Sequence, residues 1–187
     1  MAYFGRGADA AGLAFWVDEF HAGQATQAPA TLLSNIASSF GISAEAAQQY
    51  AFLAHPFATS DTEIGTFLGN VYGNLFGRGI DAAGLVYWTD QIRQKLAAGE
   101  FVGGVLVDIM SGAQNLTTGS GPHDALSLMG RIAVSLAYVH EQQEAGMHWT
   151  AADDLVDAKA ILQGVTEVPG TVLTGIARAE NVVFFDS

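Results

Sequence analysis

The chain has 187 residues and a mass near 19.6 kDa, which suits one compact domain or two small ones that share a core. Half of its residues are apolar and only 14% are charged, which excludes intrinsic disorder. The formal net charge of −12 argues against binding to nucleic acid or to an anionic membrane surface. The absence of cysteine excludes disulfides, thiolate catalysis and zinc-thiolate sites.

The first element in chain order belongs to an internal repeat. Residues 3–20 read YFGRGADAAGLAFWVDEF, and residues 75–92 read LFGRGIDAAGLVYWTDQI. Phe4 aligns with Phe76 and Trp16 with Trp88, an offset of 72 residues. Chance does not produce such agreement over so short a stretch, so the sequence predicts a duplicated supersecondary unit.

Each copy of the motif predicts a turn followed by a helix. Gly-Arg-Gly is a turn in which glycine supplies a positive φ. Asp9 and Asp81 occupy the expected helix N-cap, and the apolar residues that follow recur on one helical face. That face contains Trp16 in one copy and Trp88 in the other, and we expect both indoles to be core anchors.

The motif also repeats its charges. The arginine could clamp an anion, or it could fix the turn by bonding a nearby helix carboxylate or the turn carbonyls. We favour the structural interpretation, because each repeated unit must build the same corner. The predicted structural motif comprises Gly5, Arg6, Asp9, Trp16 and Asp18 in the first copy, and Gly77, Arg78, Asp81, Trp88 and Asp90 in the second.

Helical patterns continue along the rest of the chain. The pattern Ser60-Asp61-Thr62-Glu63 is a capping box and predicts the start of a helix that continues to Phe76. Residues 111–122 read as a Gly/Ser/Thr-rich loop, and no run of alternating strands is present. The other predicted helices cover residues 29–41, 43–53 (ending before Pro56), 99–110, 124–140, 150–163 and 170–179.

Two of these helices have unusual faces. The helix after Ser60 carries Gly65, Gly69, Gly73 and Gly77, each of which costs about 1 kcal/mol relative to alanine. We expect a close intramolecular helix crossing there, with a self-association surface as the alternative. The helix over 124–140 is apolar around most of its circumference, with one narrow polar row formed by Ser127, Arg131 and Ser135. Such a helix is normally central.

These elements predict an all-α fold. We expect one helical domain over 1–187, a compact bundle of two tandem repeat units (about 1–59 and about 60–123) followed by C-terminal helices over about 124–187. The helix leading into the second motif has no counterpart before Tyr3. We therefore expect either further chain upstream of Met1 or another molecule that covers the vacant apolar groove.

The ends of the chain bear on localisation. The N-terminus lacks a basic stretch followed by an apolar run, so no cleavable secretory signal is predicted. No apolar stretch approaches the ~20 residues that cross a bilayer, so no membrane insertion is expected. The protein is expected to be secreted or at the cell surface without such a signal, with a cytoplasmic location as the alternative. The apolar patch within residues 180–187 is either an uncleaved export signal or a final strand or helical turn on the core.

The segments YFGRGADAAGLAFW and LFGRGIDAAGLVYW resemble the signature of the bacterial domain-of-unknown-function 4214 family. Residues 160–166, AILQGVT, resemble the segment that often closes such regions. The resemblance implies a helical module of exported and surface-layer proteins, often beside calcium-binding glycine/aspartate nonapeptide repeats, with no assigned catalytic residues. This chain lacks the leading helix of its first unit and has no nonapeptide tract of its own, which argues against direct calcium dependence.

Two clusters are candidate metal sites. His140, Glu144 and His148 are spaced four apart, as ligands on one helix would be, although Ala145-Gly146 is expected to end that helix. Solvated side chains at a helix end are therefore the favoured interpretation. The acids Asp153, Asp154 and Asp157 suit a helix N-terminus, with weak calcium binding as the alternative.

The sequence thus predicts a non-enzymatic helical module of a bacterial exported or cell-surface protein. Surface-layer proteins and proteins exported by type I secretion are the expected classes. Its expected role is assembly or anchoring, through self-association or a cell-surface polysaccharide. No cofactor is expected, and calcium is the one candidate. One alternative is a metal-dependent binding protein or hydrolase that uses His140, Glu144 and His148. The other is a cytoplasmic oligomeric scaffold.

Overall fold

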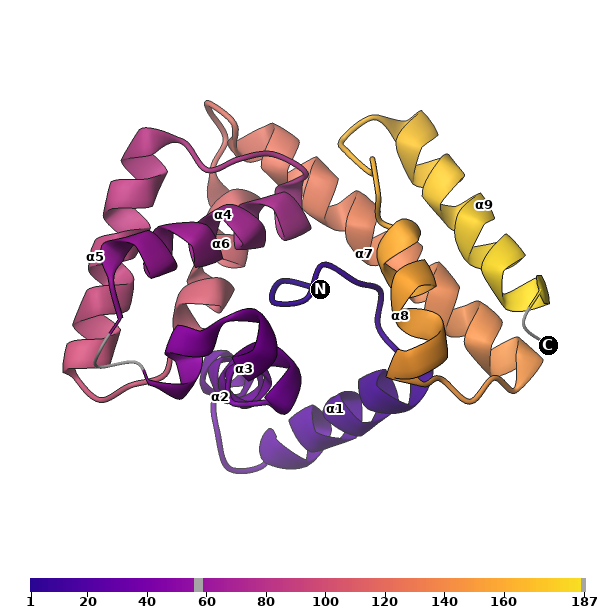
Figure 1. Cartoon of the computed structure of the whole chain (residues 1–187), viewed down its shortest axis with the longest axis horizontal. Coiled ribbons are helices and arrows are strands. Elements are labelled where there is room, and N and C mark those ends of the chain that lie inside the picture. The colour runs from indigo at the N-terminus through magenta and orange to yellow at the C-terminus, as the bar shows by residue number, and fades with distance from the viewer. Residues whose placement is uncertain (56–58, 186–187) are drawn as a thin grey trace.

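The computed structural model describes residues 1–55 and 59–185, with side chains as far as residue 182. Within these residues the chain forms nine α-helices, one short 3₁₀ helix and no strand, so the predicted all-α fold class is confirmed. The elements are α1 (Ala10–Gly23), α2 (Pro29–Gly41), α3 (Ala44–Gln49), η1 (Ala51–Ala54), α4 (Asp61–Phe76), α5 (Ala82–Ala97), α6 (Gly103–Asn115), α7 (Gly121–Ala145), α8 (Ala151–Ala160) and α9 (Pro169–Phe185) (Figure 1).

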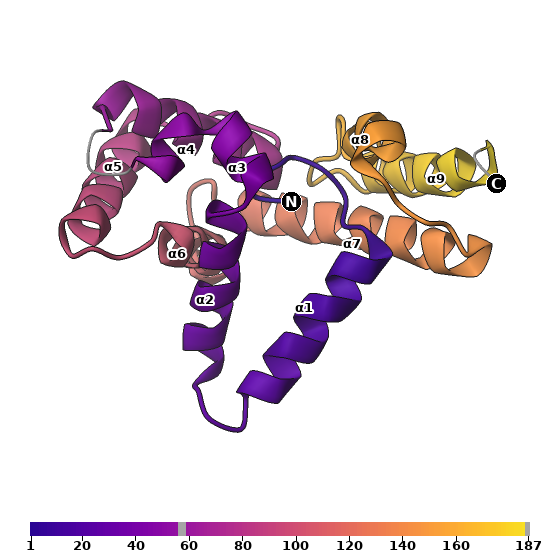
Figure 2. The same cartoon turned by 60° about the horizontal axis from the view of Figure 1, so that its bottom comes forward.

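The long helix α7 joins the two halves of the molecule. It packs along α9 in one half and contacts α4 and α6 in the other (Figure 1). The N-terminal residues lie in the middle of the molecule before the chain turns outward into α1. Helices α1 and α2 then form a V that projects from the body, joined at its tip by residues 24–28 (Figure 2).

Two apolar clusters form the core. The larger is centred on α4, whose face of Ile64, Phe67, Leu68, Val71 and Leu75 is completely buried. The smaller lies between α7, α8 and α9, and includes Tyr138 and Ile161. Met1 packs against both clusters, so the N-terminal segment lies between them.

Local capping explains where most of the helices begin. The Ser60 side chain accepts from the Glu63 backbone N–H, and Glu63 accepts from the Ser60 N–H, so the predicted capping box is confirmed. Asp9 and Asp81 are the N-caps of α1 and α5, as predicted. Helix α2 also runs from Pro29 to Gly41, as the sequence indicates.

Several predicted boundaries were wrong. The loop expected over 111–122 is mostly helical, because α6 continues to Asn115 and α7 begins at Gly121, with a proline in its first turn. The helix expected over 43–53 breaks at Tyr50 into α3 and η1. Pro56 and the last two residues of the candidate export signal lie outside the described residues. No helix in the described ranges combines the length and the apolar character needed to cross a bilayer.

The close helix crossing expected at the α4 glycines is not there. A Cβ added at Gly69 or Gly73 would meet nothing within 4 Å, so these glycines face open space. The close approach is between α2 and α6, where a Cβ at Gly103 would lie 2.5 Å from the Ala37 carbonyl carbon. Glycine is required at Gly103 because two helix backbones meet there.

Candidate functional site

The two Gly-Arg-Gly corners have the same backbone geometry. Gly5 and Gly77 adopt left-handed φ values of 62° and 71°, which glycine reaches at little cost. The Asp9 carboxylate accepts from the Gly12 N–H at 2.6 Å, and Asp81 accepts from the Gly84 N–H at 2.8 Å. The local turn and cap therefore recur in both motifs.

The arginine of each corner fixes its own turn and also reaches a distant acid. Arg6 donates to the Gly7 carbonyl at 3.1 Å, and Arg78 donates to the Gly79 carbonyl at 2.9 Å. Arg6 also bonds both carboxylate oxygens of Glu45 on α3, at 3.1 and 3.2 Å. The predicted bond to the turn carbonyls is confirmed, but the sequence contained no signal for the acid on α3.

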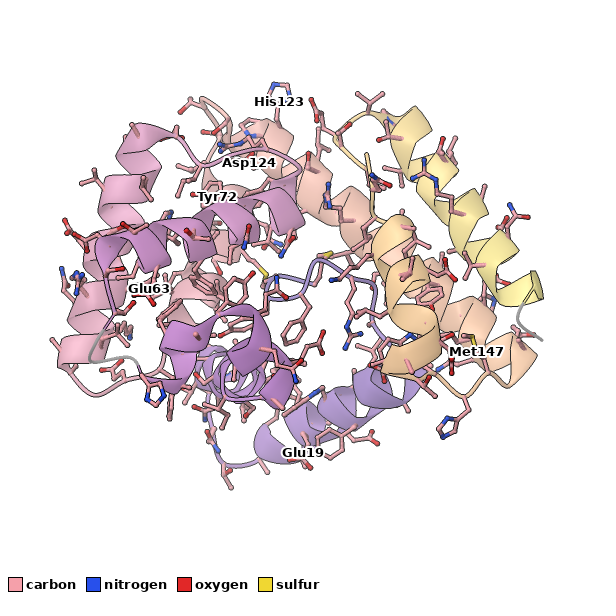
Figure 3. The ribbon with its side chains drawn as sticks, viewed as in Figure 1. Glu19, Glu63, Tyr72, His123, Asp124 and Met147 are labelled. Atoms are coloured by element: carbon pink, nitrogen blue, oxygen red, sulfur yellow. The ribbon has the colours of Figure 1, made fainter. Side chains whose placement is uncertain are left out.

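The second corner is the more tightly bonded of the two. Arg78 forms a fork on Asp124 of α7, with N–O distances of 2.7 and 2.6 Å, and Ser120 accepts a further bond. The paired carboxylate raises the pKa of Arg78. The Tyr72 ring lies 5.2 Å from the guanidinium, so Tyr72 and Asp124 hold it from two different helices (Figure 3).

The two tryptophans lie in partly different surroundings. Both are half-buried and pack edge-on against the preceding aromatic ring, Phe15 or Tyr87. Trp88 packs against the larger core and donates its indole N–H to the Tyr72 hydroxyl at 2.8 Å. Trp16 packs on Phe40 and lines a groove, so the prediction that both indoles are core anchors was wrong for Trp16.

The two repeated helix aspartates do not take part in the corners. Asp18 and Asp90 are both exposed, and neither makes a hydrogen bond or ion pair with another described residue. They are therefore not the partners of Arg6 and Arg78, a pairing that the sequence interpretation had allowed. The motif carboxylates that lie near the arginines are the N-caps, with Asp9 at 3.7 Å from Arg6 and Asp81 at 3.9 Å from Arg78.

An apolar groove of about 480 Å³ separates α1 from α2. The two helices whose residues line it form the V seen in Figure 2. Its walls are Leu13, Trp16 and Phe20 from α1, and Ile36 and Phe40 from α2. This groove lies beside the first motif, whose Arg6 and Asp9 also line it.

Helix α7 buries its polar row together with Leu128, Val134 and Tyr138, and leaves a second apolar row exposed. Its polar row of Ser127, Arg131 and Ser135 is only 2–9% exposed, so it faces the interior. Its apolar row of Leu126, Met129, Ile132 and Leu136 is 39–61% exposed, and we call this row the outer stripe. The helix is central, as predicted, because it packs on α1, α4, α6 and α9, although the outer stripe is exposed.

Side chains of α7 bond the backbone of the N-terminal segment. In that segment the Gly7 N–H donates to the Ala158 carbonyl of α8, whereas Ala8 and Ala10 bond side chains of α7. Ser135 accepts from the Ala8 N–H, and Gln142 both donates to the Ala8 carbonyl and accepts from the Ala10 N–H. Ser135 of the polar row and Gln142 thus pair with partly buried backbone groups of the N-terminal segment, which favours an inward orientation of this side of α7.

The candidate metal cluster of His140, Glu144 and His148, which the sequence analysis did not favour, does not assemble. His140 and Glu144 are exposed near the end of α7, which stops at Ala145. Gly146 adopts φ 63° and turns the chain, so His148 lies beyond the helix. In the described ranges, no three histidine or acidic side chains gather closely enough to hold a metal.

The acidic cluster on α8 has a structural role. The Asp154 carboxylate accepts from the Thr150 N–H at 2.6 Å, and Asp153 accepts from the Thr150 hydroxyl at 2.8 Å. These bonds satisfy free groups at the helix start, as favoured from the sequence. Asp157 lies one turn further along the same helix.

Comparison of the chain with protein-family models, curated protein sequences and solved structures finds no match. Membership of the family that the two motifs resemble stays a prediction.

Proposed function

We propose that this chain is a non-enzymatic helical assembly module that pairs with a second copy of itself through the outer stripe of α7. The observation that carries the proposal is the outer stripe itself, a row of four large apolar side chains that are 39–61% exposed. Contiguous exposed apolar surface of this kind marks interaction sites.

Charge favours a second copy as the partner. The formal net charge is −12, so two copies repel wherever acidic surfaces meet. Between Leu126 and Val139 the only charged residue of α7 is Arg131, which is buried, so the outer stripe carries no exposed charge. Two stripes related by a twofold axis can therefore pack without opposing like charges. A polysaccharide would need polar groups that the stripe does not offer.

The proposed setting is an exported or cell-surface bacterial protein, and it rests on the resemblance of the two Gly-Arg-Gly motifs. The non-enzymatic role rests on the sequence, which has no nucleophile-elbow, phosphate-loop or H-E-x-x-H motif. Cell fractionation tests the setting, because a protein found only inside the cell would contradict export.

Light scattering after size-exclusion chromatography tests the pairing. The wild-type chain should show a concentration-dependent mass that approaches twice 19.6 kDa. Met129→Glu and Leu136→Glu should give monomers, because each buries a charge in the interface. Val86→Glu, at an equally exposed apolar position on α5, is the matched control and should still pair. A monomeric wild type, or stripe variants that pair normally, would overturn the proposal.

A further inference from the structure

A second open surface lies on the other side of the fold, between the C-terminal half of α4 and helix α8. It is a cleft of about 760 Å³, a volume in the usual range of small-molecule sites. Gly69, Gly73 and Gly77 line the floor of the cleft, and Lys159 and Gln163 line one wall. The described residues that line the cleft include no aspartate or glutamate, although the chain has 19 acids.

Arg131 reaches this cleft from α7 as a buried cation without a carboxylate partner. It is 7% exposed, and its Nη1 donates only a long bond of 3.3 Å to the Asn74 carbonyl. Its Nε is buried and has no hydrogen-bond partner among the described residues. Burial lowers the pKa of Arg131, because nothing nearby compensates the charge. A buried cation left in this state is costly unless an anion pairs with it.

The neighbouring cations differ from Arg131 in their pairing. Arg78 also lines the cleft, but Asp124 already neutralises its guanidinium. Lys159 is exposed on α8, and its ammonium makes no hydrogen bond or ion pair with another described residue. Two uncompensated positive charges therefore face the same open space.

The glycine row explains why this space stays open. Side chains at Gly69 and Gly73 would project into the cleft without meeting any other atom within 4 Å. Each glycine costs about 1 kcal/mol of helix stability relative to alanine, and no helix packs against either one to offset the cost. Bare backbone at these two positions keeps the floor of the cleft free for a ligand.

We propose that this cleft binds a small oxyanion-bearing molecule, of the carboxylate or phosphate class, with Arg131 as the buried anchor and Lys159 as the second contact. The inference does not depend on pairing through the outer stripe, because the cleft contains none of the stripe residues. In this proposal Arg131 binds the ligand in addition to the Asn74 carbonyl at the end of α4.

Calorimetric titration of the full chain with citrate and with inorganic phosphate at low ionic strength tests the proposal. At least one of the two should bind saturably, glucose should not bind, and added salt should weaken binding. Lys159→Gln should weaken binding about tenfold, as expected for the loss of a charged hydrogen bond. Lys95→Gln is the matched control, because Lys95 pairs with Glu100 outside the cleft and should bind like the wild type.

Two further variants separate binding from folding. Gly73→Leu improves helix propensity and fills the floor of the cleft, so it should fold and lose binding. Arg131→Met removes the anchor and should also lose binding, with circular dichroism as the check on its fold. The proposal would be overturned if neither anion bound the wild type, or if Lys159→Gln and Gly73→Leu both bound normally. Either result leaves the outer-stripe proposal intact, because pairing is measured separately.

Discussion

Trp88 donates its indole N–H to the hydroxyl of Tyr72 at 2.8 Å, which ties α5 to the helix before it. Trp16, at the matching position of the first motif, instead packs on Phe40, with ring centroids 5.1 Å apart. The two motifs thus share a backbone corner but secure their indoles differently, one by a hydrogen bond and one by ring packing.

Tyr72→Phe tests the importance of that hydrogen bond. The substitution keeps the ring but removes the acceptor, so the free energy of unfolding should fall by about 0.5–1.5 kcal/mol. Tyr87→Phe is the control, because that ring is 55% exposed and makes no comparable bond. Urea unfolding followed by tryptophan fluorescence measures both. Equal losses in the two variants would mean that the Trp88 bond contributes nothing measurable.

The two arginine corners should differ in their sensitivity to loss of the acid. The Asp124 side chain is 8% exposed and bonds Arg78 at 2.6–2.7 Å, whereas that of Glu45 is 40% exposed and bonds Arg6 at 3.1–3.2 Å. Asp124→Asn should cost about 1–3 kcal/mol, because it leaves a partly buried guanidinium underpaired. Glu45→Gln should cost less than about 1 kcal/mol, since solvent screens the exposed Glu45 carboxylate and its bonds to Arg6 are longer. Thermal unfolding that ranks them the other way would contradict this account.

The capping box should give the protein an acid-sensitive contribution to stability. Hydrogen bonds from the backbone and hydroxyl of Ser60 lower the pKa of Glu63. The folded-state pKa then lies below that of the unfolded chain, so the contribution is complete above the unfolded value, near 4.5, and is lost as pH falls through the folded value. The difference in Tm between wild type and Glu63→Gln should shrink as the pH is lowered through this range.

Glu19→Gln provides the control for this pH dependence. Glu19 is exposed on α1 and makes no hydrogen bond or ion pair with another described residue (Figure 3). Its substitution should leave the Tm profile parallel to that of the wild type from neutral to acid pH. A Glu63→Gln profile that also stays parallel would show that the carboxylate adds no pH-dependent stability.

Features governed by a few adjacent residues could be predicted from the sequence. The caps at Asp9, Ser60 and Asp81 depend on side chains that bond backbone groups within the same turn, so the local pattern defines them. The turn at Gly77 follows the same logic, since glycine reaches its φ of 71° without strain. All-α architecture then follows from the succession of such helices.

Features governed by distant partners could not be predicted. The pairing of Arg78 with Asp124 joins residues 46 positions apart, and nothing in the local pattern around either one indicates the other. The inward orientation of the α7 polar row has a similar origin, because Ser135 accepts a hydrogen bond from the Ala8 N–H, 127 positions earlier in the chain. An apolar row predicts a buried face only where no other buried group competes for hydrogen bonds.

Alanine substitution should change the stability of the protein in opposite directions at the glycines of α4 and of α6. Gly69→Ala and Gly73→Ala should each stabilise the protein by about 0.5–1 kcal/mol, because the added methyl meets nothing within 4 Å and helix propensity improves. Gly103→Ala should destabilise it by more than about 2 kcal/mol, because its Cβ would collide with the α2 backbone at Ala37. Chemical denaturation of the three variants measures the signs directly. Destabilisation by the two α4 substitutions would show that another surface packs closely on this row, and the open cleft would then be occupied in solution.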